Sequence, residues 1–353
     1  MNKAIPVGLL VALAFGAAAT ETPSVSISNG SVRAKLNLPD TENGYYRGTR
    51  FDWSGSILSL EAGGHTYFGQ WFPRYDPKVH DSITGPVEDY APLNYTEAKP
   101  GETFVKIGIG VLKRLDDQPY RFSAPYELLD TGKWSVRTGA NFVEYRHEVG
   151  DPKSGYAYVY TKTIRLAPGK QQMAIEHNLK NTGAKAIETN VYNHGFFMLD
   201  SQTTGPDFTV TFPFDLKASR DMNGLAEARG KQIVYLKELQ ENPNNGGVPA
   251  DAAAASGQSR GRGGNGRQTA STPLEGFSAD VKDFDIAIEN HKTGAAVRIT
   301  ADRPLWRVNF WSIPKTVCPE AYVEVKADPG KETSWRLTYD FYTVPAKSTA
   351  AGN

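Results

Sequence analysis

The chain has 353 residues, with 39 lysines and arginines against 39 aspartates and glutamates, so its formal net charge is zero. Without a basic excess it lacks the electrostatic footprint of a protein that binds nucleic acid or an anionic membrane, and neither partner is expected. Its single cysteine, Cys318, excludes an intramolecular disulfide, so the fold must depend on an apolar core.

The first twenty residues predict a secretory leader. Lys3 precedes an apolar run over residues 7–15 and the small residues 16–19 (GAAA), which is the order of a signal peptide. We expect a signal peptide over residues 1–19 and a periplasmic or secreted protein. No later segment approaches the roughly 20 apolar residues of a transmembrane helix, so membrane insertion is not expected.

Alternating apolar and polar residues predict strands through most of the remaining chain, residues 20–353. The alternation on either side of Asn29-Gly30 predicts a hairpin, because this dipeptide accepts the positive φ angles of a tight turn. Three alternating runs within residues 156–199 are separated by turn-forming tetrapeptides and predict an antiparallel meander. The same pattern returns over residues 297–343.

Helical periodicity is nearly absent, and residues 223–229 and 235–240 are the only short candidates for helices. Many strands joined by turns rich in Gly and Pro predict an all-β fold, a large antiparallel β-sandwich in a single domain. Between about residues 241 and 273 the composition changes to Asn, Gly, Ala, Ser and Arg, which cannot bury enough apolar surface to offset the entropy of ordering. We interpret this segment as a flexible insertion between two strands, and its few arginines favour a linker over an RNA-binding tail.

One predicted strand carries a histidine among aromatic residues. Because strand side chains alternate, Tyr192, His194 and Phe196 are expected on one face. An imidazole beside aromatic rings suits proton transfer at a stacked sugar. The alternative is a hydrogen-bonded histidine of the core.

A carboxylate stands near the other end of the chain, where Glu320 follows an apolar strand and Pro319. Taken alone, Glu320 is expected to be a solvated turn residue rather than a catalytic one.

Together the two segments resemble the two catalytic signatures of the aldose 1-epimerases, a galactose mutarotase-like family. Residues 193–197 (NHGFF) are similar to the family's Asn-His-x-Tyr/Phe-Phe run, and residues 318–320 (CPE) to its Cys-x-Glu run. As in the family, Pro329-Gly330 and an alternating closing strand follow. The resemblance spans residues 24–344, although the specific motifs are short. It implies the galactose mutarotase-like supersandwich.

The resemblance also implies an isomerase that interconverts the α and β anomers of a free aldose through ring opening, with His194 as the acid and Glu320 as the base. The chemistry is compatible, because histidine and glutamate ordinarily titrate on opposite sides of neutral, so that a protonated acid and an ionised base coexist. No cofactor or metal is implied, and the expected partner is a small-molecule sugar.

The family's substrate-binding residues transfer less directly. Tyr192 is expected to contact the sugar beside His194. His80 is preferred to His65 for the family's second histidine, although the usual His-Gly-Gly run is absent, and a loop residue is the alternative.

A guanidinium presents several donors to vicinal hydroxyls, and Arg47 is preferred to Arg50 for this role, with a surface salt bridge as the alternative. Asp283 or Asp285 is the candidate for the carboxylate that accepts sugar hydroxyls. Trp306 and Trp311 are expected on opposite faces of one strand, so at most one of them reaches the sugar, and core packing is preferred for both.

Two other functions share this fold class. A non-catalytic carbohydrate-binding protein needs the pocket but not the proton-transfer pair. A polysaccharide lyase or hydrolase needs a tyrosine or paired carboxylates in an open cleft. Neither the identity of the sugar nor the oligomeric state follows from the sequence.

Overall fold

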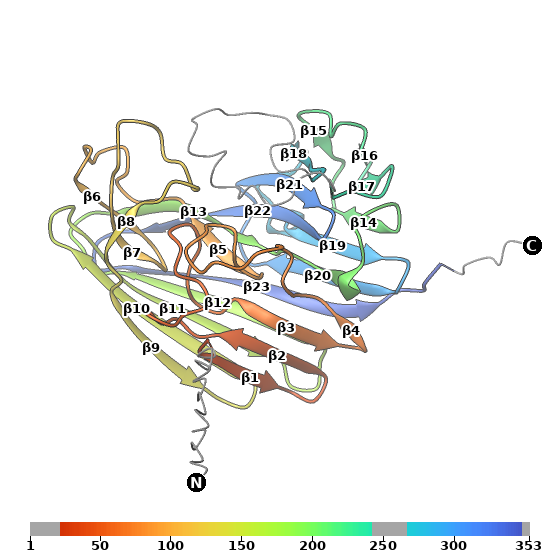
Figure 1. Ribbon diagram of the computed structural model, residues 1–353, viewed down its shortest axis with the longest axis horizontal. Helices are drawn as coiled ribbons and strands as arrows, with labels where there is room; N and C mark the ends of the chain where they lie inside the picture. Colours follow the sequence, from red (N-terminus) through yellow and green to blue (C-terminus); the bar gives the residue numbers. More distant parts are fainter. Residues whose placement is uncertain (1–21, 242–266, 348–353) are drawn as a thin grey trace, which may run out of the picture.

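The structure is a computed structural model that describes residues 22–241 and 267–347. The expected signal peptide and residues 242–266 of the expected insertion lie outside the described residues. The described chain folds into antiparallel strands in four sheets, with two short 3₁₀ turns, η1 (Leu199–Ser201) and η2 (Val281–Asp283). Figure 1 shows their arrangement.

The largest sheet has ten strands and forms one broad layer of the molecule. In spatial order they are β16 (Ala226–Arg229), β17 (Gln232–Tyr235), β14 (Phe208–Thr211), β19 (Asp285–Asn290), β20 (Ala295–Ala301), β23 (Glu332–Thr343), β12 (Gln172–Asn181), β11 (Tyr156–Leu166), β10 (Phe142–Asp151) and β9 (Lys133–Thr138).

Three smaller sheets pack on or beside this layer. The six-stranded sheet contains β15 (Lys217–Ala218), β18 (Ala270–Glu275), β21 (Arg307–Ile313), β22 (Thr316–Ala327), β13 (Ile187–His194) and β5 (Val87–Tyr90). The four-stranded sheet contains β1 (Ser24–Ser28), β2 (Val32–Asn37), β3 (Ile57–Ala62) and β4 (His65–Thr66). The three-stranded sheet contains β6 (Thr103–Lys106), β7 (Gly110–Lys113) and β8 (Glu127–Asp130).

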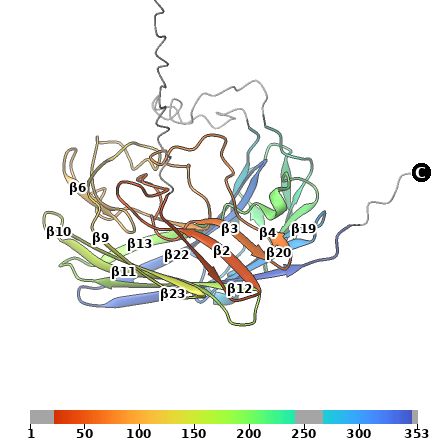
Figure 2. The ribbon, with the colours of Figure 1, turned by 60° about the horizontal axis from the view of Figure 1, so that its bottom comes forward.

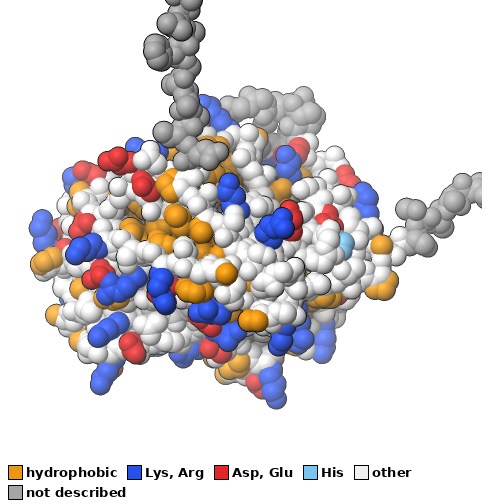
Figure 3. All heavy atoms as spheres, turned by 90° about the horizontal axis from the view of Figure 1, so that it is seen from below, with side chains coloured by type: hydrophobic (Ala, Val, Ile, Leu, Met, Phe, Trp, Pro, Cys, Tyr) orange, Lys and Arg blue, Asp and Glu red, His pale blue; other side chains and the backbone are white. Residues whose placement is uncertain are grey.

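The main core lies between the ten-stranded sheet and the sheets above it (Figures 1 and 2). Alternation sends Val323 and Val325 of β22 into this core, where they join Leu337 and Tyr339 of β23. The expected all-β antiparallel sandwich is confirmed. On the face shown in Figure 3, Lys and Arg are interspersed with Asp and Glu.

The expected hairpin at Asn29-Gly30 is present as β1 and β2, and Gly30 has a φ of +89°. The expected meander is correct only for β11 and β12, because β13 leaves that sheet and pairs with β22 and β5. The free edge of β12 is instead occupied by β23. The chain therefore crosses between sheets after β12 and again after β22, and this crossing brings β13 beside β22.

Other expectations are corrected. Residues 226–229 form β16 and residue 235 ends β17, so the two helix candidates are wrong. The insertion cannot extend to residue 273, because β18 begins at Ala270 and buries Ala270, Thr272 and Leu274 in alternation. No helix of the described residues is long and apolar enough to cross a membrane.

A second core fixes loops over the outer face of the six-stranded sheet. It is rich in aromatic side chains from the segment before β3, the segment before β5 and the three-stranded sheet; they include Tyr46, Phe51, Trp53, Trp71, Phe104 and Tyr126. Phe196, just beyond β13, packs among them. These loops and the sheet face enclose the candidate site.

Candidate functional site

The strand register places His194 beside Glu320. Tyr192 of β13 lies opposite Tyr322 of β22. Because the two strands are antiparallel, two residues later on β13 and two residues earlier on β22 bring His194 opposite Glu320. Glu320 is in turn paired with Asn309 of β21. The Nε2 atom of His194 lies 3.4 Å from Oε1 of Glu320, and Asn309 donates a hydrogen bond to Oε2 at 2.8 Å.

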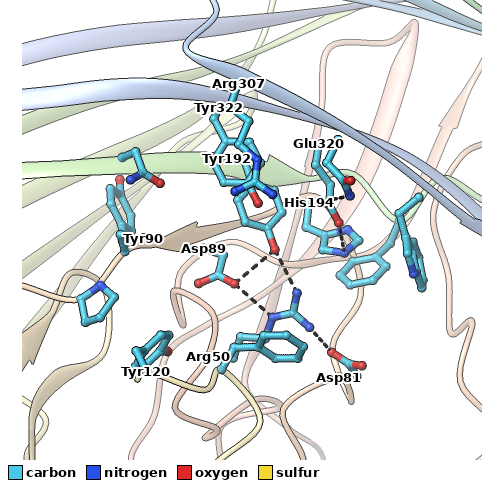
Figure 4. Close-up of a pocket in the computed structure, with 17 residues that line it drawn as sticks. Arg50, Asp81, Asp89, Tyr90, Tyr120, Tyr192, His194, Arg307, Glu320 and Tyr322 are labelled. Carbon is cyan, nitrogen blue, oxygen red and sulfur yellow. Dashed lines mark hydrogen bonds and ion pairs between the residues drawn. The ribbon is translucent and has the colours of Figure 1, made fainter. Parts of the chain in front are cut away.

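These side chains line an open pocket of about 480 Å³. Figure 4 shows strand residues on one side and loop residues, including Arg50 and Asp81, on the other. Its aromatic walls come from both sides, from Tyr192, Tyr322 and Trp311 on the strands and Tyr120 and Phe122 on a loop. A pocket with aromatic walls and converging polar groups is typical of a small-ligand site.

Burial moves the pKa of both central groups toward their neutral forms. It lowers the pKa of His194 well below its ordinary value, and the nearby Arg50 charge lowers it further. Burial raises the pKa of Glu320 to about 7, with Asn309 and Arg50 only partly opposing the shift. A neutral imidazole therefore faces a carboxyl that is roughly half protonated at pH 7, which differs from the expected pairing of a protonated histidine with a fully ionised glutamate.

The backbone turns sharply just after His194. Phe196 has a φ of +44°, a left-handed conformation that costs a non-glycine residue about 1 to 2 kcal/mol. Its ring stacks on His194 at a centroid distance of 3.6 Å and on Trp71 at 4.7 Å. The N–H of Gly195 donates to Sγ of Cys318 at 3.1 Å. The turn thus joins the two sequence motifs and holds the imidazole plane.

Arg50 is the cation at the loop side of the pocket. Its Nε donates to Asp89 at 3.0 Å, its Nη2 donates to the Tyr192 hydroxyl at 2.9 Å, and its Nη1 pairs with Asp81. Burial opposes the charge of Asp81, but Arg50 and then His80 outweigh it and hold the pKa of that carboxyl well below its usual range. The loop wall is therefore an ionised network, in contrast to the His194 and Glu320 pair.

A fully buried lysine supports this wall from behind. Lys106 donates to Asp89 at 2.8 Å, to the Tyr120 hydroxyl at 2.9 Å and to the carbonyl of Arg50. Because Asp89 receives hydrogen bonds from both cations, its position and that of the guanidinium are fixed before any ligand binds.

The preference for Arg47 over Arg50 is wrong. Arg50 lines the pocket, whereas the Arg47 side chain does not, and its buried Nε has no hydrogen-bond partner. His80 does not line the pocket either. Its ring lies behind the wall, 3.3 Å from Asp81 and against Phe122, and the next residue, Asp81, supplies the pocket surface. His65 lies elsewhere, bonded to Asp200.

The choice of Asp283 or Asp285 is also wrong for this pocket. Asp283, at the end of η2, accepts a hydrogen bond from the N–H of Ser278, and Asp285 pairs with Arg298 on the ten-stranded sheet. Trp311 lines the pocket, and Trp306 is 46% exposed, so the expectation of core packing for both is wrong. Tyr192 lines the pocket as expected.

Sequence reasoning missed several pocket residues: Asp81, Asp89, Tyr120, Phe122, Arg307, Asn309 and Tyr322. One signal was available in the sequence. Asp89 lies in a short run (VEDY) where two adjacent acidic residues stand in a segment without a turn-forming residue. Among the described residues, no group of three or more His, Cys, Asp or Glu side chains is arranged to hold a metal ion.

No family model matches the sequence, and no curated protein matches it. Among solved structures the chain is similar to a protein from Synechocystis sp. PCC 6803, at 12% identity and a TM-score of 0.51 over 92% of this chain and 97% of that one. It is also similar to an aldose epimerase homologue from C. elegans, at 13% identity and a TM-score of 0.50 over 92% and 100% of the two chains.

A third similar structure is a galactose mutarotase-like protein from Clostridium acetobutylicum, at 12% identity and a TM-score of 0.50 over 91% of this chain and 95% of that one. At such identities the likeness concerns the fold alone. The chain has the galactose mutarotase-like fold expected from its sequence motifs.

Proposed function

We propose that this protein is an aldose 1-epimerase that interconverts the α and β anomers of a free sugar. The observation that carries the proposal is the contact of 3.4 Å between His194 Nε2 and Glu320 Oε1 in an open, aromatic-walled pocket. The ring oxygen and the anomeric hydroxyl of an aldose are bonded to the same carbon. Two proton-transfer groups that lie side by side can therefore reach both oxygens at once.

The reaction needs one proton delivered to the ring oxygen while another leaves the anomeric hydroxyl. With a neutral imidazole and a carboxyl whose pKa is raised to about 7, the pair retains one transferable proton up to neutral pH. The short contact lets this proton pass from Glu320 to His194, which gives the acid His194 and the base Glu320 without uptake from solvent. Ring opening moves a proton from His194 to the ring oxygen and another from the hydroxyl to Glu320, and reclosure after rotation of the aldehyde reverses both transfers.

The loop wall supplies recognition in this proposal. Arg50 is buried between the rings of Phe51 and Phe122, at 4.4 and 4.0 Å, and its guanidinium is held by Asp89 and Tyr192. Asp81 and Asp89 present carboxyl oxygens that can accept hydrogen bonds from sugar hydroxyls. Tyr322 and Trp311 offer aromatic faces to the pyranose.

The test is the rate at which purified protein accelerates the decay of optical rotation of fresh α-glucose and α-galactose. Positioned acids and bases each contribute about 10² to 10⁴ in rate, so we expect His194→Gln and Glu320→Gln to lose activity by factors of that order. Asp283→Asn, remote from the pocket, is the matched control and keeps full activity.

Sugar binding with no acceleration would support the non-catalytic carbohydrate-binding alternative instead. Release of unsaturated or new reducing ends from a polysaccharide would support the lyase or hydrolase alternative. Full activity in Glu320→Gln would contradict the proposal.

We further propose that the protein acts in the periplasm or outside the cell. The support is the sequence order of Lys3, the apolar run and the small residues 16–19. N-terminal sequencing of protein expressed with its full chain tests this, and an intact Met1 terminus in the exported fraction would contradict cleavage after Ala19.

A further inference from the structure

A second hollow adjoins the main pocket along β22. It has a volume of about 390 Å³ and is lined by Arg303, Leu305, Trp306, Glu324, Lys326 and Thr333, among others. Tyr322 lines the main pocket, and the next two side chains on the same face of β22, Glu324 and Lys326, line the second hollow.

The strand register places the two hollows side by side. Asn190 of β13 lines the main pocket, and its cross-strand partner on β22 is Glu324 of the second hollow. The ring of Trp306 in the second hollow lies 6.3 Å from the ring of Tyr322 in the main pocket. From Glu320 to Lys326 the strand covers roughly 20 Å, which is several times the width of one pyranose ring.

Trp306 is the feature of this hollow that needs an explanation. It is 46% exposed, although tryptophan is normally largely buried. Its neighbours Arg303, Glu324 and Lys326 supply charged hydrogen-bonding groups around the ring. A flat aromatic face surrounded by polar side chains matches a sugar ring, which has apolar C–H faces and a rim of hydroxyls.

Arg307 lies at the junction of the two hollows. Its guanidinium lies 5.1 Å from the centre of the Tyr322 ring, and it makes no hydrogen bond or ion pair with any residue that the structure describes. Arg50 on the opposite wall, by contrast, is already bonded to Asp81, Asp89 and Tyr192. The donors of Arg307 are thus available to a ligand that passes from one hollow to the other.

We propose that the ligand is a reducing oligosaccharide, with its terminal unit beside His194 and Glu320 and its next unit stacked on Trp306. This inference rests on the proposed function for its orientation, because only the reducing unit has a free anomeric hydroxyl. The remaining units then follow β22 away from Glu320.

The test compares glucose with maltotriose and cellotriose, with anomer exchange measured by NMR. We expect the wild type to have a higher kcat/KM for at least one trisaccharide than for glucose. Trp306→Ala should lower kcat/KM for that trisaccharide about tenfold, the size of an aromatic contact of roughly 1.4 kcal/mol, and leave glucose unchanged. Trp306→Phe should restore most of the loss, and Leu236→Ala, an equally exposed apolar residue, should have no effect.

Equal kcat/KM for glucose and both trisaccharides, or equal losses on all sugars in Trp306→Ala, would overturn the inference while leaving the proposed function intact. If the wild type accelerates no anomer exchange, the proposed function fails, and calorimetry decides the inference separately. Trisaccharide binding that weakens about tenfold in Trp306→Ala would then sustain it, and binding unaffected by the substitution would overturn it.

Discussion

The two faces of the β5 and β13 pair differ in how their polar and charged side chains are paired. Glu88 and Asn193 are cross-strand partners that point into the interior, and their chain neighbours Asp89 and His194 point into the pocket. On the inner face, Asn193 donates to Glu88 at 2.9 Å and accepts from the Tyr339 hydroxyl at 2.6 Å. Glu88 and Asn193 are thus both bonded to other protein groups.

The centre of the inner cluster is Lys162, which is fully buried. It pairs with Glu88, lies 3.4 Å from Asp52 and donates to the carbonyl of Ser54 at 2.8 Å. Burial works against its charge, but Glu88 and Asp52 outweigh burial and raise the pKa of Lys162. The ammonium therefore stays charged.

On the pocket face, the side chains at the centre of the sheet have fewer hydrogen-bond partners. Within residues 22–241 and 267–347, Nδ1 of His194 is buried without a hydrogen-bond partner, and Glu320 has only Asn309 and the imidazole within bonding distance. Because no lysine or arginine of the described residues forms an ion pair with Glu320, burial dominates and its pKa rises toward neutrality. Side chains one residue apart on the same strands are thus tightly paired on the inner face and have fewer partners on the pocket face.

The largest effect on stability is expected from the inner face. Lys162→Met leaves Glu88 and Asp52 buried without their cation, and breaking a buried pair in this way costs about 3 to 5 kcal/mol. Urea unfolding measures the loss. Lys180→Met, on the exposed side of β12, is the control and should change the free energy of unfolding little. If Lys162→Met lowered the free energy of unfolding by less than about 1 kcal/mol, which is the range of an exposed ion pair, the contrast between the two faces would be contradicted.

The pocket face should respond in the opposite direction. A carboxyl whose folded pKa is about 7, against 4.5 ordinarily, binds its proton more tightly in the folded state, so stability falls as pH rises from 4.5 to 7. Glu320→Gln removes this penalty, and we expect the variant to be more stable than the wild type at pH 8 by up to about 3 kcal/mol and equally stable at pH 4. Thermal unfolding at both pH values tests this, and a variant that is less stable at pH 8 would refute it.

The loop wall allows a smaller test of recognition. Arg50→Lys keeps the charge but loses the planar set of donors that bonds Asp81, Asp89 and Tyr192 together. With charged hydrogen bonds contributing about 1.5 to 3 kcal/mol, kcat/KM for the sugar should fall roughly 10- to 100-fold. Arg47→Lys is the matched control and should keep its activity. The opposite ranking of the two variants would restore Arg47 as the sugar-binding arginine.

The sequence predicts the strand part of the site better than the loop part. Alternation alone places Tyr192 and His194 on one face, and the two motifs identify His194 and Glu320. Alternation cannot predict that β13 pairs with β22. The strand before β13 and the strand after β22, namely β12 and β23, pair with each other in the other sheet. The 3.4 Å contact depends on that exchange of partners.

Arg50, Asp81 and Asp89 illustrate the limit more clearly. The residues of β5 are all buried, so no alternation distinguishes Glu88 from Asp89. Arg50 and Asp81 lie on loops whose positions are set by the aromatic core beneath them. Nothing local separates Arg50 from Arg47, three positions away, and Asp283 lies in η2 and does not line the pocket.

The pH dependence of the rate of anomer exchange should again separate the pocket face from the inner face. The proposed reaction needs the single proton that His194 and Glu320 share, and this proton is lost as the pH rises past the Glu320 pKa of about 7. Anomer exchange should therefore fall roughly tenfold for each pH unit well above 7, because the active fraction falls in that proportion. Below pH 7 the rate should stay level until His194, with its lowered pKa, takes a second proton. A protonated histidine paired with an ionised glutamate of ordinary pKa values would instead keep the rate level only between about pH 4.3 and 6.5. Rates measured from about pH 3.5 to about pH 9 distinguish the two, since a decline that begins near pH 6.5 and a loss of activity below about pH 4.3 would place the proton on His194 in the resting protein.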